Sequence, residues 1–424
     1  MRVKVLIMKR SNWFFILFGL FAVKGLYVEA SVMRSQNIAQ MQSLSPQAEI
    51  SLLTCSPSDD AVFTLYGHTA LRVCDPAAKI DRVYNYGIFE YSKPNFIYRF
   101  AKGETDYKLG ANHFNYFLFE YMSRGSEVYE QVLNLLPEEK EALYQALLWN
   151  EKPENRVYRY NFFFDNCATR PVVMVENNLQ GVINFTPTAA APSTSTTDFP
   201  HQTFRDVINY CTRNHPWVTF GCDLVLGLPT DRTMTLRETF FIPEYLKNAF
   251  NKAEIVREGK SAPLVKQVNI LAENEQPPQE PPLFIVSPVG CFWLLFILIA
   301  ALTFYEWRKI KYYRFADVIL FFAAGIAGCI LFFLSFMSVH PSIFPNINLL
   351  WLHPFHLIGI IFFSIKKWKK IANWYHFINF AAIIIMSVCW FFIPQHVNSA
   401  FIPAMACLWL RSGWALIRNI NSIR

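Results

Sequence analysis

Long apolar stretches occupy the last third of this 424-residue chain and constrain its fold more than any other feature. Five of them lie near residues 284–305, 316–337, 349–365, 374–394 and 400–417. Each is about long enough to cross a bilayer, for which a helix needs roughly 20 apolar residues. Within lipid every backbone N–H and C=O must be paired inside the segment, so such spans are helical. Residues 284–424 are therefore predicted to form an all-α domain of five transmembrane helices.

The loops between these stretches differ in charge. "SVHPSIFPNIN" and "PQHVNS" contain neither Lys nor Arg, whereas "KKWKK" lies between the third and fourth stretches. Between the first and second stretches lie Arg308, Lys309, Lys311 and Arg314. By the positive-inside rule, the basic loops and the C-terminus face the cytoplasm, and the large N-terminal region lies outside.

The net positive charge of the chain belongs to this membrane region. Residues 284–424 carry a net charge of +9, and residues 1–283 carry −2. Cations beside membrane helices face anionic lipid headgroups, so they are not a signal for DNA or RNA. We expect the membrane, and no nucleic acid, as a partner.

The N-terminal part divides into three segments. Residues 1–30 place basic residues ahead of a short apolar run and end in "VEA", which is typical of a secretory signal peptide, with an uncleaved anchor as the alternative. Residues 31–262 are long enough for one packed, exported domain. Residues 263–283 include "ENEQPPQEPP" and are predicted to form a semi-rigid linker to the membrane region.

The exported domain is predicted to be α+β. Runs rich in β-branched and aromatic residues favour antiparallel strands, and amphipathic runs with acidic or capping residues at their starts favour helices. The expected strands lie at residues 48–56, 61–75 and 81–91, and the expected helices at 114–125, 137–153 and 166–179. A Pro, Ala and Ser-rich segment at 186–199 is predicted to be a long loop.

Cys167 is the candidate nucleophile. It lies in "RYNFFFDNCATRP", where polar neighbours argue against a buried structural thiol, and a helix N-terminus there would lower its pKa and offer N–H groups to an oxyanion. A thiol nucleophile needs a base. His68 is the best candidate because "YGHTALRV" places it on a strand directly after a glycine, where another segment can approach closely.

A third group should orient the imidazole of His68. We choose Asn85, because its strand is expected to pair with the histidine strand and an amide can hold one imidazole tautomer. Asp75 and Tyr86 are rivals, and Tyr86 is also a candidate for contacting substrate. Asn166 either shapes the substrate site or caps the following helix.

Several further residues are candidates for binding a lipid. Arg72 lies an even number of residues beyond His68, so it shares a strand face with it and is suited to a lipid phosphate. Arg170 is a similar candidate, and for both the alternative is an internal ion pair. In the membrane region, Asn346, Asn348 and His353 either line a lipid-accessible groove or are simply hydrated. Arg411 is expected to snorkel toward the cytoplasm.

The chain resembles a known family on these same residues. "TLYGHTALRV", "DRVYNYGIF", "AKGETDYKL", "YNFFFDNCATRP" and "PWVTFGCDLVLG", with "NINLLWLHPFHLI" in the membrane region, look like motifs of the Lnb family of bacterial lipoprotein N-acyltransferases. The order of histidine strand, "VYNYG" strand and cysteine helix is similar to the permuted branch of the NlpC/P60 papain-like fold. The resemblance implies a periplasmic catalytic domain attached to the bacterial inner membrane by a multi-pass domain.

The resemblance also implies a reaction. Cys167 would take an acyl chain from a phospholipid as a thioester, and His68 would accept the thiol proton and later that of the incoming amine. The acceptor would be the N-terminal α-amino group of a diacylglyceryl-cysteine lipoprotein. No residue spacing indicates a metal, and we expect no cofactor. The alternatives are a membrane-tethered cell-wall peptidase or amidase of the NlpC/P60 type, and a non-catalytic sensor.

Overall fold

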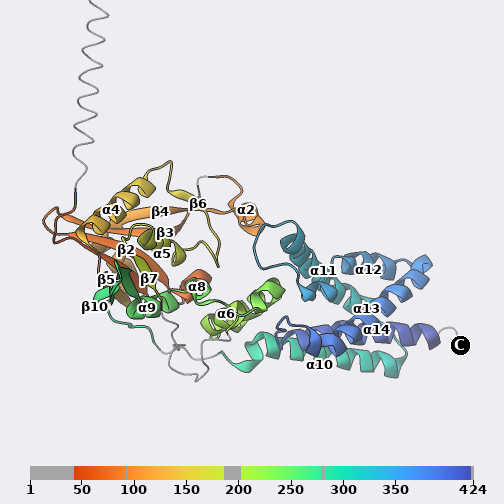
Figure 1. Ribbon diagram of the computed structural model, residues 1–424. Helices are drawn as coiled ribbons and strands as arrows, with labels where there is room; N and C mark the ends of the chain where they lie inside the picture. The colour runs from red at the N-terminus through yellow and green to blue at the C-terminus, as the bar shows by residue number, and fades with distance from the viewer. Residues whose placement is uncertain (1–42, 92, 186–201, 278–281, 422–424) are drawn as a thin grey trace, which may run out of the picture.

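The computed structural model describes residues 43–91, 93–185, 202–277 and 282–421. The predicted signal peptide at 1–30 and the whole of the predicted loop at 186–199 lie outside these residues. Figure 1 shows a sheet-containing N-terminal domain on one side and a bundle of long helices on the other. The prediction of an α+β domain followed by a helical domain is confirmed.

A seven-stranded antiparallel sheet forms the centre of the N-terminal domain, in the order β10-β5-β1-β2-β3-β4-β6. Its strands are β1 (Glu49–Cys55), β2 (His68–Asp75), β3 (Ile80–Phe89), β4 (Asp106–His113), β5 (Val128–Leu133), β6 (Val157–Arg159) and β10 (Val265–Ala272). A smaller sheet joins β7 (Val182–Asn184), β8 (Glu254–Arg257) and β9 (Lys260–Pro263).

Two sequence-based boundaries were wrong. The segment Val265–Ala272, which we assigned to the linker, is an edge strand paired with β5, so the folded domain extends ten residues beyond 262 to residue 272. The segment Val62–Tyr66, which we assigned to a strand, is the 3-10 helix η1. Gly67 separates η1 from β2 with φ +77°, and a Cβ there would lie 2.8 Å from the carbonyl oxygen of Cys55. Because of this close approach, strand β2 begins only at His68, after Gly67.

Helices cover both faces of the large sheet. On one face, apolar residues of α4 (Pro137–Glu151), α5 (Thr169–Glu176) and α9 (Pro243–Lys252) pack with Leu71, Val73 and Tyr84 in the main core. On the other face, α3 (Phe114–Ser123) packs against Ala70 and Val83. Because side chains alternate along a strand, His68 points to the α3 face together with Ala70.

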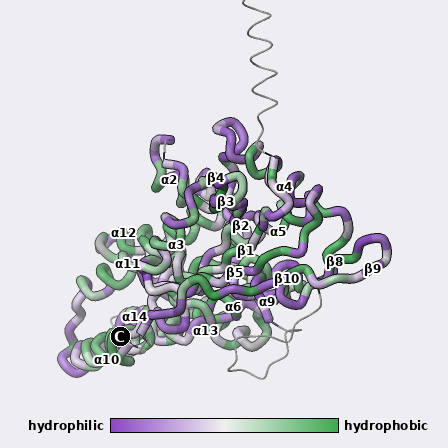
Figure 2. The backbone as a smooth tube through the Cα atoms, turned by 90° about the vertical axis from the view of Figure 1, so that its left-hand side faces the viewer, coloured by the Kyte–Doolittle hydropathy of each residue, from purple (hydrophilic) through white to green (hydrophobic). Residues whose placement is uncertain are grey.

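The C-terminal region contains α10 (Pro288–Lys309), α11 (Arg314–Phe336), α12 (Phe355–Ser364), α13 (Lys369–Cys389) and α14 (Phe401–Asn421). Figure 2 shows hydrophobic residues along α11 and α12. Within the described residues, α10, α11 and α13 are long and apolar enough to cross a membrane. α12 is shorter than predicted because Pro354 precedes it and cannot lie inside a helix without disrupting it.

Arg411 does not snorkel, contrary to our expectation. Its guanidinium is fully buried and pairs with Asp317 at 2.5 Å and Glu306 at 2.8 Å, both of which are also fully buried. Thr303 accepts a further hydrogen bond from it at 3.0 Å. Two carboxylates from α10 and α11 hold this charge inside the bundle, which removes the need to reach water.

The two domains meet at α7 (Pro216–Val225), which follows α6 (Phe204–Thr212). Phe220 of α7 packs on Phe292 and Phe401, which belong to α10 and α14. The amides of Asn346 and Asn348 donate to the last carbonyls of α7, at distances of 2.9 to 3.3 Å. These two buried asparagines therefore join the domains and cap a helix, a role that differs from both the lipid-groove and the hydration alternatives.

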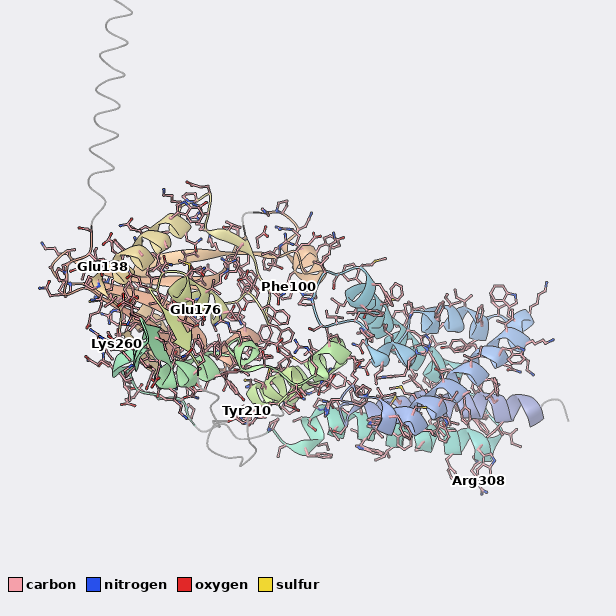
Figure 3. The ribbon with its side chains drawn as sticks, viewed as in Figure 1. Phe100, Glu138, Glu176, Tyr210, Lys260 and Arg308 are labelled. Atoms are coloured by element: carbon pink, nitrogen blue, oxygen red, sulfur yellow. The ribbon has the colours of Figure 1, made fainter. Side chains whose placement is uncertain are left out.

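The loops that contact the N-terminal domain are those without Lys or Arg. Gly227 donates to Ser342 and Leu228 to Pro345, each at 2.8 Å, and Asn398 donates to Asp223 at 2.8 Å. Arg308 lies at the opposite end of the helical bundle (Figure 3). The folded arrangement thus separates the basic loops from the N-terminal domain, as the positive-inside rule requires.

Arg205 stabilises the junction between the two domains, so its replacement should destabilise the protein. It is buried, and it binds Asp231 at 2.7 Å and Asp223 at 3.1 Å. Arg205→Leu should lower the free energy of unfolding by about 3–5 kcal/mol, because two buried carboxylates lose the guanidinium that neutralises them. The measurement is thermal unfolding of the purified full-length protein. Arg213→Leu, at an exposed position after the same helix, is the control, and equal melting temperatures for the two variants would contradict the prediction.

Candidate active site

The regular strand pairing of the large sheet is interrupted beside His68. Pairing between β2 and β3 ends at Leu71 and Tyr84, before it reaches His68, and pairing between β3 and β4 is irregular between Asn85 and Ile88. Such irregularities bend a strand and redirect its side chains. The opening exposes His68 and Asn85 to the segment that carries Cys167.

Gly87 lies within this irregularity and permits the approach of Cys167. Its φ is +91°, which favours glycine, and a Cβ at this position would lie 3.3 Å from the Cβ of Cys167. The same point is 4.0 Å from Cε1 of His68. Cys167 and His68 therefore flank one backbone position, and any larger residue there would push the cysteine away.

Asn85 contacts His68 as predicted. The Oδ1 atom of Asn85 lies 2.5 Å from Nε2 of His68. An amide oxygen only accepts hydrogen bonds, so Nε2 must carry a proton, which leaves Nδ1 as the basic nitrogen. The ring is also held by Tyr121 of α3, which stacks on it with centroids 6.0 Å apart. Tautomer and orientation of the imidazole are thus both set by neighbours.

The turn before α5 positions Cys167. The hydroxyl of Thr69 donates to the carbonyl oxygen of Cys167 at 2.7 Å, which ties this turn to the histidine strand. Oδ1 of Asn166 accepts from the N–H groups of Ala168 and Thr169 at 2.8 and 2.9 Å. These amides are therefore occupied and do not face an oxyanion, contrary to our expectation for the helix N-terminus. Pro171 lies in the first turn of α5.

The electrostatics differ from those expected of a thiolate. Burial raises the pKa of the Cys167 thiol to about 11, although hydrogen bonds from the backbone N–H groups of Thr69 and Cys167 oppose this shift. Burial lowers the pKa of His68 to about 4, and the charge of Arg124 lowers it further, against the opposing effect of Asn85. The resting site at pH 7 is therefore a neutral thiol beside a neutral imidazole. Our prediction of a lowered thiol pKa was wrong, because desolvation outweighs local N–H groups.

A cavity of about 280 Å³ contains this pair. His68, Asn85, Gly87 and Cys167 line it together with many aromatic side chains, including Phe63, Phe89, Tyr91, Tyr107, Tyr121 and Tyr160. Arg124 and Glu120 of the α3 segment also line it, and they form an ion pair at 2.5 Å. The cavity joins a thiol, an imidazole and a large aromatic surface, a combination that suits an apolar substrate with a polar end.

Two predicted substrate-binding residues lie elsewhere. Arg72 shares a strand face with His68, as expected, but its guanidinium binds Asp81 at 2.8 Å and Glu130 at 3.0 Å and stacks on Phe114. It is therefore occupied by an internal network. Tyr86 points to the opposite face of the sheet, where its buried hydroxyl donates to Asn150 at 2.6 Å. The rival orienting residue Asp75 binds Ser45 at the far end of β2.

The other predicted substrate-binding residues, Asn166, Arg170 and His353, also contact other parts of the protein and do not line the cavity. Asn166 is buried and caps the turn, and its amide group donates to Phe162 and Phe241 at 2.8 Å. Arg170 binds Asp165 in a bidentate pair and stacks on Tyr158 at 3.4 Å. His353 lies in the membrane domain, stacked on His356, apart from the cavity lining.

Sequence reasoning missed the aromatic lining and the pair Glu120–Arg124. Tyr121 and Arg124 lie at the end of "FNYFLFEYMSRG", which was noted only as a helix. The motif does indicate a role beyond core packing. A helix that only faces the core has one apolar stripe, whereas aromatic residues lie on every side of this helix. Tyr107 and Tyr160 stack at 4.0 Å, a pairing between β4 and the cysteine segment that spacing alone does not predict.

The described residues include all nine cysteines, and each of them is a free thiol. In the described ranges, no three His, Cys, Asp or Glu side chains gather in a way that would hold a metal ion.

The raised thiol pKa predicts how Cys167 reacts with iodoacetamide. The thiolate fraction of a group with a pKa near 11 grows about tenfold per pH unit through pH 9, so the alkylation rate should rise with it and show no plateau near neutrality. Mass spectrometry of the Cys167 peptide measures the rate. The same cysteine in the denatured chain is the control, and its rate should level off above pH ~8.5. A plateau below pH 8 in the folded protein would instead indicate a thiolate–imidazolium pair.

Comparisons with known proteins agree with this arrangement. Residues 35–210 match the model of the Lnb N-terminal periplasmic domain, and residues 279–422 match the model of the Lnb transmembrane domain. No curated protein and no solved structure matches the chain. The two matched regions contain His68, Asn85 and Cys167 in the first and α10 to α14 in the second. The chain is therefore a member of the Lnb family, with a periplasmic domain followed by a transmembrane domain.

Proposed function

We propose that this protein is a lipoprotein N-acyltransferase. It transfers an acyl chain from a phospholipid, through a thioester on Cys167, to the N-terminal α-amino group of a diacylglyceryl-cysteine lipoprotein. The observation that carries the proposal is the placement of Cys167 beside His68, itself oriented by Asn85, in an aromatic cavity. Membership of the Lnb family supports a lipoprotein-modifying enzyme.

The first half of the reaction acylates the enzyme. Nδ1 of His68 takes the thiol proton as Sγ of Cys167 attacks the ester carbonyl of the phospholipid, which forms a C–S bond. The tetrahedral intermediate then breaks the ester C–O bond, and the imidazolium returns the proton to the departing lysophospholipid alcohol. The backbone N–H groups of Thr69 and Cys167, which hydrogen-bond the sulfur, are the candidates to stabilise the oxyanion.

The second half transfers the chain to the lipoprotein. The neutral α-amino group attacks the thioester carbonyl and loses a proton to His68 as the C–N bond forms. The C–S bond then breaks, and the imidazolium reprotonates the sulfur. A neutral resting pair suits this cycle because the proton moves only when an acyl group is in place, so the thiol is protected from other reactions between turnovers.

The membrane attachment fits substrates that stay in the bilayer. Both the phospholipid and the diacylated lipoprotein carry acyl chains, so an enzyme acting on them has to work at the membrane surface. We place the protein in the bacterial inner membrane as a multi-pass protein with its cavity in the periplasm. The packing of α7 on the transmembrane helices supports a fixed position of the cavity relative to the bilayer.

Cys167→Ala should abolish N-acylation. The chain and this variant are expressed in cells that lack their own N-acyltransferase, and the acyl chains on the N-terminus of one reporter lipoprotein are counted by mass spectrometry. We expect a third acyl chain with the intact protein and no third chain with the variant, because Cys167 is the cysteine that lines the cavity beside His68. Cys211→Ala, which removes a thiol outside the cavity lining, is the matched control and should retain activity.

Two results would contradict this function. A diacyl N-terminus with a folded, membrane-inserted wild-type protein would favour the cell-wall peptidase or amidase, for which release of a peptidoglycan fragment is the test. Triacylation by both wild type and Cys167→Ala would remove Cys167 from the chemistry.

Asn85→Asp should shift the pH dependence of activity. A carboxylate 2.5 Å from the imidazole favours its charged form and raises the pKa of His68 from about 4 toward neutrality. Only the neutral imidazole accepts the thiol proton, so the acid limb of kcat/KM should move to higher pH. Asn85→Ala should instead lower kcat about 10- to 100-fold through loss of orientation. An unchanged acid limb in Asn85→Asp would show that Asn85 does not act on His68.

A further inference from the structure

We propose that helix α2 (Phe96–Lys102) inserts into the outer surface of the phospholipid bilayer and that an aromatic row behind it guides the donor acyl chain to Cys167. The second part rests on the proposed function, because it needs a phospholipid as acyl donor. The first part concerns the location of α2 alone. The two parts are tested separately below.

α2 exposes apolar side chains that water does not favour. None of its residues is buried, and Ile97, Tyr98 and Phe100 are 83%, 56% and 48% exposed. An isolated helix of this length is marginal in water, and helices of proteins are normally stabilised by burying an apolar face. Contacts within the described residues leave this face open. A lipid surface would cover it.

The contacts of α2 place it at the level of the membrane. The ring of Tyr98 lies 6.2 Å from that of Phe333, which is in the last turns of the membrane-spanning helix α11. The carbonyl oxygen of Lys102 accepts from the N–H of Val339 at 2.8 Å, and His340 contacts the carbonyl oxygen of Phe100 at 2.9 Å. Figures 1 and 3 show α2, with Phe100, beside the end of α11. α2 is thus held beside the C-terminal end of the transmembrane helix α11, the end that faces the N-terminal domain.

The charge next to α2 fits lipid phosphates. Asp106 pairs with three cations, Lys93 at 2.5 Å, Arg99 at 2.8 Å and Arg159 at 3.1 Å. Lys102 and Glu104 pair at 2.6 Å beside them, so four cations face two carboxylates in this group. The side chains of Lys93 and Arg159 are about half exposed. Basic residues beside an exposed apolar helix are typical of segments that lie in the membrane interface. A protein partner has no comparable feature in its favour, so we commit to a phospholipid surface.

An aromatic row connects α2 to the cavity. Phe100 lies 6.2 Å from Phe96, and Phe96 lies 4.8 Å from Tyr91 and 5.7 Å from Phe89. Phe89 contacts Tyr107 at 4.6 Å, and Tyr107 stacks on Tyr160 at 4.0 Å. Four of these residues line the cavity that contains Cys167. The rings therefore form an unbroken series of contacts from α2 to the cavity that contains Cys167, which suits an acyl chain whose ester has to reach Sγ.

The first experiment locates α2. Ile97 is replaced by the photo-crosslinking residue benzoylphenylalanine in the full-length protein, which is reconstituted in vesicles of phosphatidylethanolamine and phosphatidylglycerol. Irradiation and mass spectrometry then detect covalently attached lipid. Val182, which is 65% exposed on β7, carries the same residue as a control. Lipid attached at Ile97 and not at Val182 is expected, and equal labelling or none at Ile97 would overturn the membrane insertion of α2.

The second experiment tests the route of the acyl chain. Thioester formation on Cys167 is followed with a long-chain phospholipid in vesicles and with dihexanoyl phosphatidylcholine dissolved as monomers. Ile97→Asp should slow acylation by the vesicle lipid about tenfold, since a charge opposes insertion, and leave the dissolved donor within about twofold. Val182→Asp should change neither rate.

The outcomes separate the two proposals. Equal slowing with both donors would mean that Ile97→Asp damages the site itself, which would overturn the proposed route. Absence of a thioester on wild-type Cys167 with either donor would contradict the proposed function and with it the acyl route. The crosslinking result would still decide whether α2 lies in the membrane.

Discussion

The pairing of β3 with β4 is interrupted around Gly87, and the turn that carries Cys167 packs into the resulting gap. Every feature of the candidate active site depends on this contact. The interruption frees Asn85 to face His68, and the missing Cβ of Gly87 allows the cysteine to approach. Thr69, the neighbour of His68, then fastens the cysteine turn to β2 through a hydrogen bond. Cys167 and His68 are thus held by backbone geometry as well as by side chains.

Burial gives the site its chemical character. The same aromatic surroundings that suit an acyl chain also withdraw water from the thiol and the imidazole, so both stay neutral. In the proposed function, the proton moves from Cys167 to His68 only when an acyl group is bound. The junction of α7 with the transmembrane helices, centred on buried Arg205 and the capping residues Asn346 and Asn348, supports a constant distance between the cavity and the bilayer.

The sequence predicted the parts of the site that depend on local pattern. His68 and Cys167 stood out by residue type and by the motifs around them, and Asn85 followed from the expected strand pairing. Arg72 and Arg170 form the internal ion pairs that the sequence left as the alternative to lipid binding. The sequence could not decide between the two, because the carboxylates that bind them lie on other segments or across a turn. The edge strand Val265–Ala272 was missed because its partner β5 lies far away in the chain, and pairing at such a distance leaves only a weak local signal.

The sequence by itself determined the division into an exported α+β domain and a helical membrane domain, their orientation signals and the two residues proposed as nucleophile and base. Hydrophobic length, charge and strand alternation are local properties, so they can be read without coordinates. Only the tertiary structure decided the protonation of the pair, the aromatic lining, the roles of Asn346 and Asn348 and the position of α2 beside α11. These depend on burial and on contacts between distant segments, which arise only when the chain packs.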